Sequence, residues 1–135
     1  MKDILYHNPK IEIRRSLIAG WGIFAKEDIE QDEILEEAPF LTLPMDPYES
    51  SSLFIDYRFN FPSNVPKWKE QAIPFGFSCL YNHSNTESSA FWYTDEENRL
   101  FIFKTKRHIK KDEEILVYYG SESYWKDGRT HINVK

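Results

Sequence analysis

The sequence predicts a mostly β domain with little helix, and three observations support this prediction. Apolar and polar residues alternate over short runs, as expected of half-buried strands. The runs are separated by glycine, proline and acidic turn residues. The chain has 135 residues, of which 41% are hydrophobic and 16% aromatic, which is enough to fill one core. We therefore expect a single domain over residues 1–135.

The strand-like runs are, in order, Ile11–Arg14, Ile23–Ala25, Glu33–Leu43, Ala90–Thr94, Leu100–Thr105 and Glu114–Tyr118. Gly20 and Gly22 permit a tight turn after the first run, and Gln31-Asp32 predicts another turn before the third. Pro44 ends the third run, because proline cannot donate to a strand ladder.

The middle of the chain, residues 45–75, is irregular and rich in proline, serine and aromatic residues. It predicts one short helix around Trp68–Ala72. The runs Ala90–Thr94 and Leu100–Thr105 predict a hairpin that turns through Asp95–Asn98. No internal repeat, low-complexity tract or linker is evident.

Charge and cysteine content exclude several classes of protein. The net charge is −5, and the densest basic stretch, Lys104–His108, is too short for a nucleic-acid stripe, so no direct nucleic-acid binding is expected. An acidic surface weakly favours a basic partner such as a lysine-rich tail. Cys79 is the single cysteine, which excludes an intramolecular disulfide and a cysteine-rich zinc site. No signal peptide or membrane-spanning run is evident, so we expect a soluble intracellular protein.

Three short segments carry the candidate chemistry: Ala19–Phe24, Tyr81–Asn85 and Glu113–Gly120. Each alone has an ordinary interpretation. The first could be a plain turn between strands, and the second a loop cap with a buried histidine. The third could be core or interface tyrosines. No Ser or Cys nucleophile pattern accompanies His83, and the other histidines show no metal-ligand spacing, so no metal is expected.

In this order and with these gaps, the three segments resemble the signature segments of the SET domain, the fold of most protein-lysine methyltransferases. The resemblance runs from about residue 11 to residue 125. It implies a β-clip-like fold of several small sheets with short helices and a pseudo-knotted C-terminal segment. The chain is most similar to the compact stand-alone SET proteins of large DNA viruses and bacteria, and the run Phe75-Gly76-Phe77 adds to this similarity.

The resemblance implies S-adenosylmethionine as cofactor, with S-adenosylhomocysteine as product and no metal. It assigns cofactor binding to Ala19, Gly20, Trp21, Tyr57, Asn82, His83, Tyr124 and Trp125. Asn82 would bind the amino-acid end of the cofactor and the main chain of His83 the adenine edge, while Gly22 would be a packing glycine. Either Tyr124-Trp125 stacks over adenine or Trp125 covers a hydrophobic patch at the chain end.

By the same resemblance, Tyr119 is the catalytic tyrosine at the reaction centre. Phe91, Val117 and Tyr57 would flank the substrate lysine, although strand residues such as Phe91 and Val117 are usually core. Methyl transfer from a sulfonium to a neutral amine is an in-line displacement that rests on alignment and desolvation. A tyrosine hydroxyl can polarise the methyl group through weak contacts, and aromatic walls accommodate a cationic lysine.

The sequence departs from the family pattern at Glu87 and Ser88, where Pro-Asn is frequent, and at Asp112, where glycine is usual. These departures motivate a second hypothesis, a non-catalytic SET-like module that binds a basic peptide. The enzyme hypothesis expects a lysine-containing protein substrate, which a histone could supply. By analogy with the viral proteins, a homodimer and action in a host nucleus are further expectations.

Overall fold

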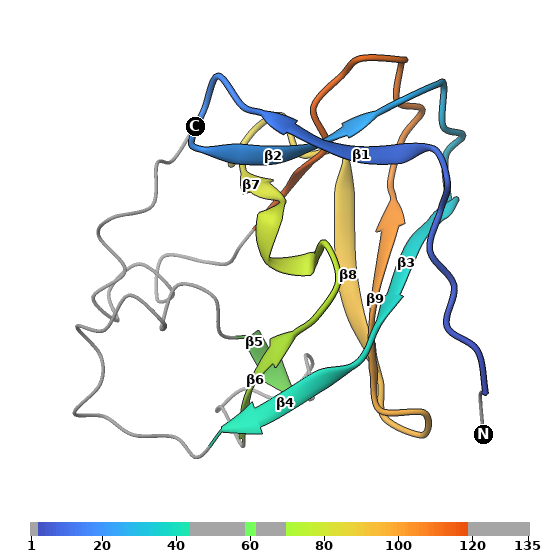
Figure 1. The fold of residues 1–135 in the computed structure, drawn as a ribbon, viewed down its shortest axis with the longest axis vertical. Coiled ribbons are helices and arrows are strands. Elements are labelled where there is room, and N and C mark those ends of the chain that lie inside the picture. Colours follow the sequence, from blue (N-terminus) through green and yellow to red (C-terminus); the bar gives the residue numbers. More distant parts are fainter. Residues whose placement is uncertain (1–2, 44–58, 62–69, 119–135) are drawn as a thin grey trace.

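The structure, a computed structural model, describes residues 3–43, 59–61 and 70–118, and the regular secondary structure in these ranges is almost entirely β (Figure 1). The described strands form a two-stranded sheet, β1-β2, a five-stranded sheet, β3-β9-β8-β10-β7, and a three-stranded sheet, β4-β6-β5. A 3-10 turn, η3 (Ser78–Leu80), connects β6 to β7. The prediction of a mostly β fold with several small sheets is confirmed. No helix in the described part of the chain is long and apolar enough to cross a membrane.

The first sheet is an antiparallel ribbon of β1 (Ile11–Arg15) and β2 (Trp21–Ala25). Its turn passes through Gly20, whose φ of 47° lies in the left-handed region that glycine adopts without steric cost. An isolated bridge joins Phe24 of β2 to Glu114, just before β10. The ribbon is therefore attached to the segment that leads into the C-terminal strand.

The five-stranded sheet contains β3 (Ile34–Ala38), β7 (Asn82–His83), β8 (Ala90–Asp95), β9 (Leu100–Thr105) and β10 (Leu116–Val117). The predicted hairpin is confirmed as β8 and β9, paired antiparallel in register along their whole length. β10 lies between β7 and β8 and is parallel to both. The strand predicted over Glu114–Tyr118 is thus shorter than expected, and it inserts between strands that precede it in the chain.

The third sheet contains β4 (Phe40–Leu43), β5 (Phe59–Phe61) and β6 (Glu70–Pro74). The single strand expected over Glu33–Leu43 is two strands, because Pro39 lacks an N–H and the chain changes partner there, from β9 to β6. The helix predicted around Trp68–Ala72 is wrong over Glu70–Ala72, which pair with β4 and β5, and Trp68 lies outside the described residues. Sheet pairing overrides the local pattern at this point.

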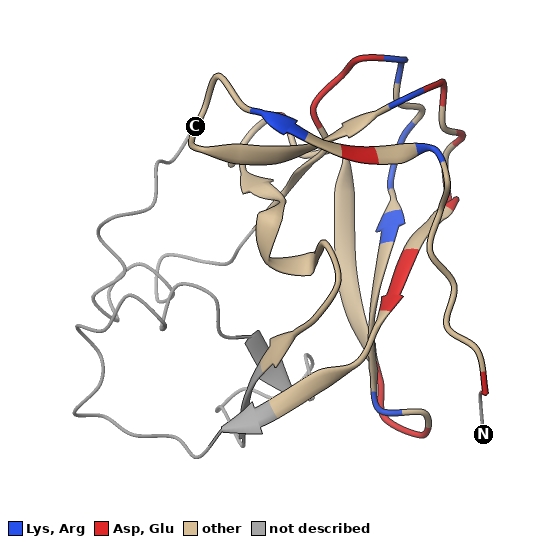
Figure 2. Cartoon of the chain, viewed as in Figure 1, with Lys and Arg blue, Asp and Glu red and all other residues tan. Residues whose placement is uncertain are grey.

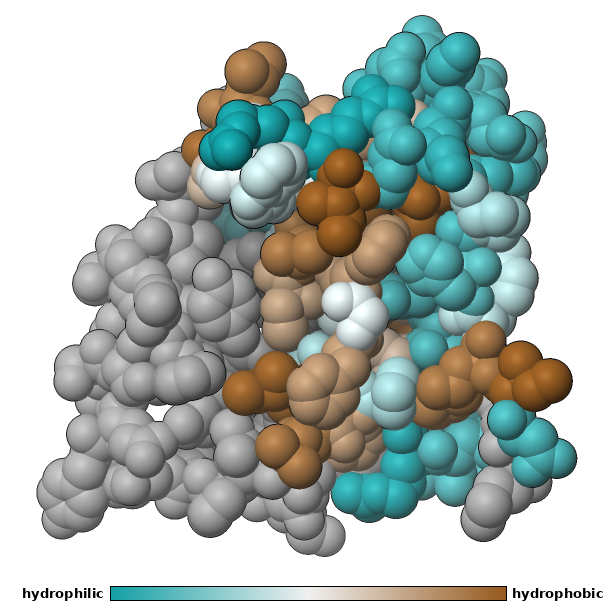
Figure 3. Space-filling view, viewed as in Figure 1, coloured by the Kyte–Doolittle hydropathy of each residue, from teal (hydrophilic) through white to brown (hydrophobic). Residues whose placement is uncertain are grey.

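The core is built from aliphatic and aromatic side chains of the five-stranded sheet and of the elements that pack against it. Tyr81 stacks on Phe103 with ring centroids 4.8 Å apart, and both side chains are buried. Fully buried residues include Ile23, Leu35, Phe101 and Ile115. Figure 3 shows hydrophilic surface over the loops at upper right, whereas hydrophobic surface runs down the middle of the same face.

Two loops, residues 26–33 and 106–113, bind each other in a reciprocal arrangement. Ile29 N–H donates to the Ile109 carbonyl and Ile109 N–H donates to the Ile29 carbonyl, both at 2.8 Å. Asp32 and Asp112 occupy matching positions with positive φ values of 62° and 69°. We refer to this pair of loops as the clasp.

The clasp reflects a short repeat in the sequence. Both loops read Lys-x-x-Ile-x-x-Asp-Glu, starting at Lys26 and at Lys106. In each loop the Glu side chain accepts a hydrogen bond at 3.2 Å from the backbone N–H three residues before it. The expectation of no internal repeat is therefore wrong at this short scale, since the repeated residues make equivalent bonds.

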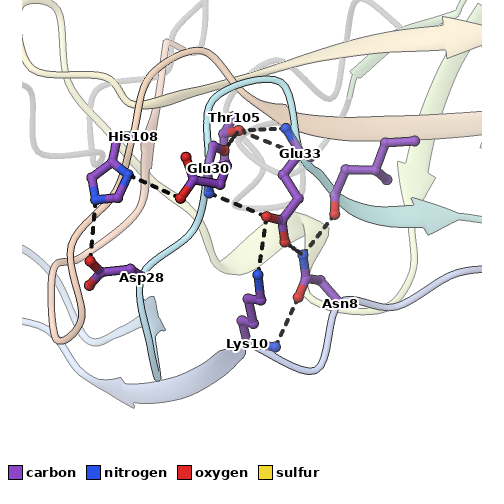
Figure 4. Close-up of polar contacts among 8 residues, drawn as sticks. Asn8, Lys10, Asp28, Glu30, Glu33, Thr105 and His108 are labelled. Carbon is purple, nitrogen blue, oxygen red and sulfur yellow. Dashed lines mark hydrogen bonds and ion pairs between the residues drawn. The ribbon is translucent and has the colours of Figure 1, made fainter.

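One half of the clasp is tied to the N-terminal segment, as Figure 4 shows. Glu33 accepts hydrogen bonds from the Asn8 side chain at 2.7 Å and from Lys10 Nζ at 3.2 Å. The buried Thr105 hydroxyl donates to the Glu30 carbonyl at 2.6 Å and accepts from Glu33 N–H at 2.9 Å. Charged residues concentrate on these loops in Figure 2, where both signs are interspersed.

Candidate functional site

The three sequence segments converge where β2, β7 and β10 meet. The side-chain amide nitrogen of Asn82, the first residue of β7, donates to the carbonyls of Ala19 and Trp21 at 3.3 and 3.4 Å. The same nitrogen donates to Glu114 Oε2 at 2.7 Å. The turn before β2, the Asn-His pair and the Glu-Glu pair therefore form one contiguous site, as their joint assignment in the sequence implied.

Gly22 is required at this site because of close packing. A Cβ atom on Gly22 would lie 2.3 Å from Glu114 Oε2 and 3.0 Å from Asn82 Nδ2. Gly20, in contrast, has no atom within 4 Å of an added Cβ, so its need for glycine is conformational. The two glycines serve different purposes, and the packing role expected of Gly22 agrees with this geometry.

The backbone of Asn82 and His83 is held by the parallel ladder with β10, in which Leu116 is opposite Asn82 and Val117 opposite His83. The His83 side chain is 1% exposed, and its Nε2 lies 2.8 Å from Asn85 Oδ1. Burial lowers the pKa of His83, and the Asn85 contact offsets this only in part. The ring is thus a buried group, which leaves the main chain of His83 for the ligand contact that we expect.

Two further residues belong to the site and were not singled out from the sequence. Ser16 Oγ donates to Glu114 Oε1 at 2.7 Å, across 98 positions of the chain. The same Ser16 oxygen accepts from the backbone N–H groups of Ile18 and Ala19 at 2.9 and 3.4 Å. Glu114 therefore connects the β1–β2 turn to Asn82. The only sequence signal for this role was the position of Glu114 in the Glu-Glu pair.

The two described members of the predicted substrate channel, Val117 and Phe91, do not share one face. Val117 is 1% exposed and pairs with Ala90 inside the core. Phe91 is 38% exposed and stacks on Tyr93, with ring centroids 6.0 Å apart, on the opposite side of β8. Their assignment to a lysine channel stays a prediction.

Four predicted site residues, Tyr57, Tyr119, Tyr124 and Trp125, lie outside the described residues. The last described residue, Tyr118, is 47% exposed, and its ring centroid lies 5.5 Å from that of His83. Tyr119 follows it directly in the sequence. The described backbone therefore ends one residue before the expected catalytic tyrosine.

The departures from the family pattern are accommodated locally. Asp112 adopts the positive φ that favours glycine, and its carboxylate lies 2.9 Å from Arg14. The backbone N–H of Glu87 donates to Ser84 Oγ at 2.8 Å, while the buried Ser88 hydroxyl accepts from Lys106. The loop after Asn82-His83 is therefore closed by its own polar contacts in place of the frequent Pro-Asn pair.

An open hollow of about 590 Å³ adjoins Glu114 and is lined by Thr86, Glu87, Arg107, Glu113, Glu114 and Leu116. Arg107 is paired with Glu113, so the charge of the lining is acidic on balance. Among the residues that the structure describes, no group of three or more His, Cys, Asp or Glu side chains could hold a metal ion.

Comparison with known proteins agrees with this geometry. The SET domain family matches residues 20–120, which contain all three converging segments except Ala19. The chain belongs to the SET domain family. A relative from Schizosaccharomyces pombe, described as a histone-lysine N-methyltransferase specific for H3 lysine-37, is 27% identical over 122 residues, which are 87% of this chain and 78% of the relative. A crystal structure from Plasmodium falciparum, of a candidate histone methyltransferase, has 29% identity and a TM-score of 0.68, and the match covers 87% of this chain and 98% of that one.

Proposed function

We propose that this SET domain is an S-adenosylmethionine-dependent protein-lysine N-methyltransferase. The observation that carries the proposal is the convergence of the Gly20–Gly22 turn, Asn82 and the strand that leads to Tyr119. Family membership, a relative described as a histone-lysine N-methyltransferase and the solved structure of a candidate histone methyltransferase support it.

The residues of the site fit the amino-acid end of the cofactor. The turn leaves open space beside Gly20, where an added Cβ would meet no atom within 4 Å, whereas Glu114 and Asn82 fill the space beside Gly22. The Asn82 amide lies against this turn and can offer a polar group to the ligand. Five of the proposed cofactor-binding residues would line this part of the site: Ala19, Gly20, Trp21, Asn82 and His83. The other proposed cofactor-binding residues are Tyr57, Tyr124 and Trp125.

The cofactor supplies a methyl group that is already activated by its positive sulfur, so the protein has to align and desolvate the reactants. The turn and Asn82 would hold the donor, and the hydroxyl of Tyr119 would accept weak contacts from the methyl group. The nucleophile is the neutral amine of lysine, which a narrow and water-poor channel favours over the charged form. Tyr57, Phe91 and Val117 are the proposed walls of that channel.

The proposed substrate is a lysine in a basic protein segment, for which a histone tail is the first candidate. The chain has a net charge of −5, and the hollow beside Glu114 is acidic on balance, so a basic segment is electrostatically favoured. The relatives described as acting on histones support the same choice.

The test is calorimetric titration with S-adenosylhomocysteine, followed by mass spectrometry of core histones incubated with protein and S-adenosylmethionine. We expect one site per chain and mass increases of 14 Da, the size of an added methyl group. Tyr119→Phe should keep binding and lose transfer by about 100-fold or more. A folded protein that bound histone peptides but neither cofactor nor product would instead support the non-catalytic module.

A further inference from the structure

We propose that Glu114 is a positioning residue that orients the Asn82 amide so that its carbonyl oxygen faces the ligand. This inference deepens the proposed function and rests on it. The residue would act through Asn82 on the α-ammonium of the cofactor's amino-acid end, without touching the reacting atoms.

The surroundings of the Asn82 amide determine its orientation. Its nitrogen is placed among three acceptors, namely Glu114 Oε2 at 2.7 Å and the carbonyls of Ala19 and Trp21 at 3.3 and 3.4 Å. An amide oxygen at this place would meet three other oxygens, so only the nitrogen fits there. The shortest of the three contacts is the one to the carboxylate, and bonds to charged acceptors are the stronger kind.

The consequence is that both N–H groups of Asn82 point into the protein. The described residues donate no hydrogen bond to its Oδ1 atom, which is the part of the amide left for a ligand. An oxygen of this kind can only accept. It suits the α-ammonium of an amino acid and disfavours the α-carboxylate, so the orientation selects how the amino-acid end binds.

Glu114 is itself held at both oxygens, which makes it a firm anchor. Ser16 Oγ donates to Oε1 while Asn82 donates to Oε2, and both distances are 2.7 Å. The missing side chain of Gly22 gives the carboxylate its space. Four groups from two distant segments, namely Ser16 and the carbonyls of Ala19 and Trp21 in one and Glu114 in the other, thus specify the direction of one amide.

The experiment measures the affinity of Glu114→Ala for S-adenosylhomocysteine and for 5′-methylthioadenosine, which keeps the adenosine and lacks the amino-acid end. We expect about a 10- to 100-fold loss for the first ligand, because a hydrogen bond to a charged group is weakened. The affinity for methylthioadenosine should be unchanged. Glu113→Ala, at the neighbouring glutamate that contacts Arg107 and not Asn82, is the matched control and should bind both ligands normally.

A double-mutant cycle separates positioning from general damage. In an Asn82→Ala background, Glu114→Ala should cost less than about twofold further, since the residue through which it acts is already removed. Equal losses for both ligands, or a full loss in the Asn82→Ala background, would overturn the proposal.

Glu114→Gln covers the case in which Glu114→Ala does not fold. Glutamine has one acceptor oxygen for two donors, Ser16 and Asn82, so about a 3- to 10-fold loss for S-adenosylhomocysteine alone is expected. Wild-type affinity in Glu114→Gln would contradict the positioning role. If the wild-type protein bound no S-adenosylhomocysteine, the proposed function would fail, whereas normal binding by wild type and variants alike would reject only the role of Glu114.

Discussion

Replacement of Gly22 by alanine should damage the site through one identifiable collision. The new Cβ would lie 2.3 Å from Glu114 Oε2 and 3.0 Å from the Glu114 carboxyl carbon. Because these atoms are the end of a flexible side chain, Glu114 can move aside more cheaply than the backbone can. In moving, it would lose its contacts with Ser16 and Asn82.

The cost can be worked out from those contacts. Two hydrogen bonds to a partly exposed carboxylate contribute about 1 kcal/mol each, the value of an ordinary hydrogen bond, because solvent weakens the effect of the charge. Residual crowding against Asn82 Nδ2, 3.0 Å from the new Cβ, adds about 1 kcal/mol. Gly22→Ala should therefore lower the free energy of unfolding by about 2–4 kcal/mol.

The assay is urea unfolding of Gly22→Ala, Glu114→Ala and the double variant. Glu114→Ala alone should cost about 1–3 kcal/mol, but in the Gly22→Ala background it removes the colliding atoms and should cost nothing or stabilise the protein. Gly20→Ala is the control, since its Cβ meets no atom within 4 Å and its cost is only the positive φ, about 1–2 kcal/mol. Its effect should add to that of Glu114→Ala within about 0.5 kcal/mol. If the effects of Gly22→Ala and Glu114→Ala on the free energy of unfolding added as closely as those of the control pair, the collision would not be the cause of the destabilisation.

Three other outcomes follow from buried polar groups. Thr105→Val should lower the free energy of unfolding by about 2–3 kcal/mol in urea titration, because the Glu30 carbonyl and Glu33 N–H lose their shared partner. Burial raises the pKa of Glu36 above its ordinary value of 4.5, so its contribution to stability is full below pH 4.5 and is lost as pH rises through the raised pKa. Across pH 4–8, the free energy of unfolding of wild type should therefore fall relative to that of Glu36→Gln as pH rises. A difference that did not depend on pH would contradict this. Burial raises the pKa of Cys79 to about 12, so native protein at pH 8 should react with Ellman's reagent about 100-fold more slowly than unfolded protein, and equal rates would contradict the burial.

Local patterns in the sequence were sufficient for the elements whose partners are close in the chain. The β8–β9 hairpin and the β1–β2 ribbon were predicted near their observed bounds, since alternation and turn residues specify both. The parallel insertion of β10 between β7 and β8 was not predicted, because no local pattern specifies a partner far away in the chain.

The same distinction applies to the site. Asn82 and the glycine turn were predicted because both belong to recognisable sequence motifs. Ser16 was missed because its partner, Glu114, is 98 residues away and a single serine in a turn carries no signal of its own. Val117 is buried, and its assignment to a channel stays a prediction, since core and channel walls use the same residue type. Side-chain direction depends on register, which the structure supplies.

The repeat within the clasp escaped notice because its flanking residues differ, and only Lys, Ile, Asp and Glu recur at equal spacing. Such a short pattern is common by chance. It becomes meaningful once Ile29 and Ile109 are seen to exchange backbone hydrogen bonds.

The clasp has a consequence for how the protein is made. Ile29 and Asp32 emerge from the ribosome before their backbone partners, Ile109 and Thr105, which lie more than 70 residues further along the chain. Until then the loop over residues 26–33 has no acceptor or donor for its inward backbone groups, and such groups are costly to bury unpaired. The nascent chain is therefore expected to stay open at this loop until residues 105–109 have left the exit tunnel, so that a later segment commits an earlier one to its fold.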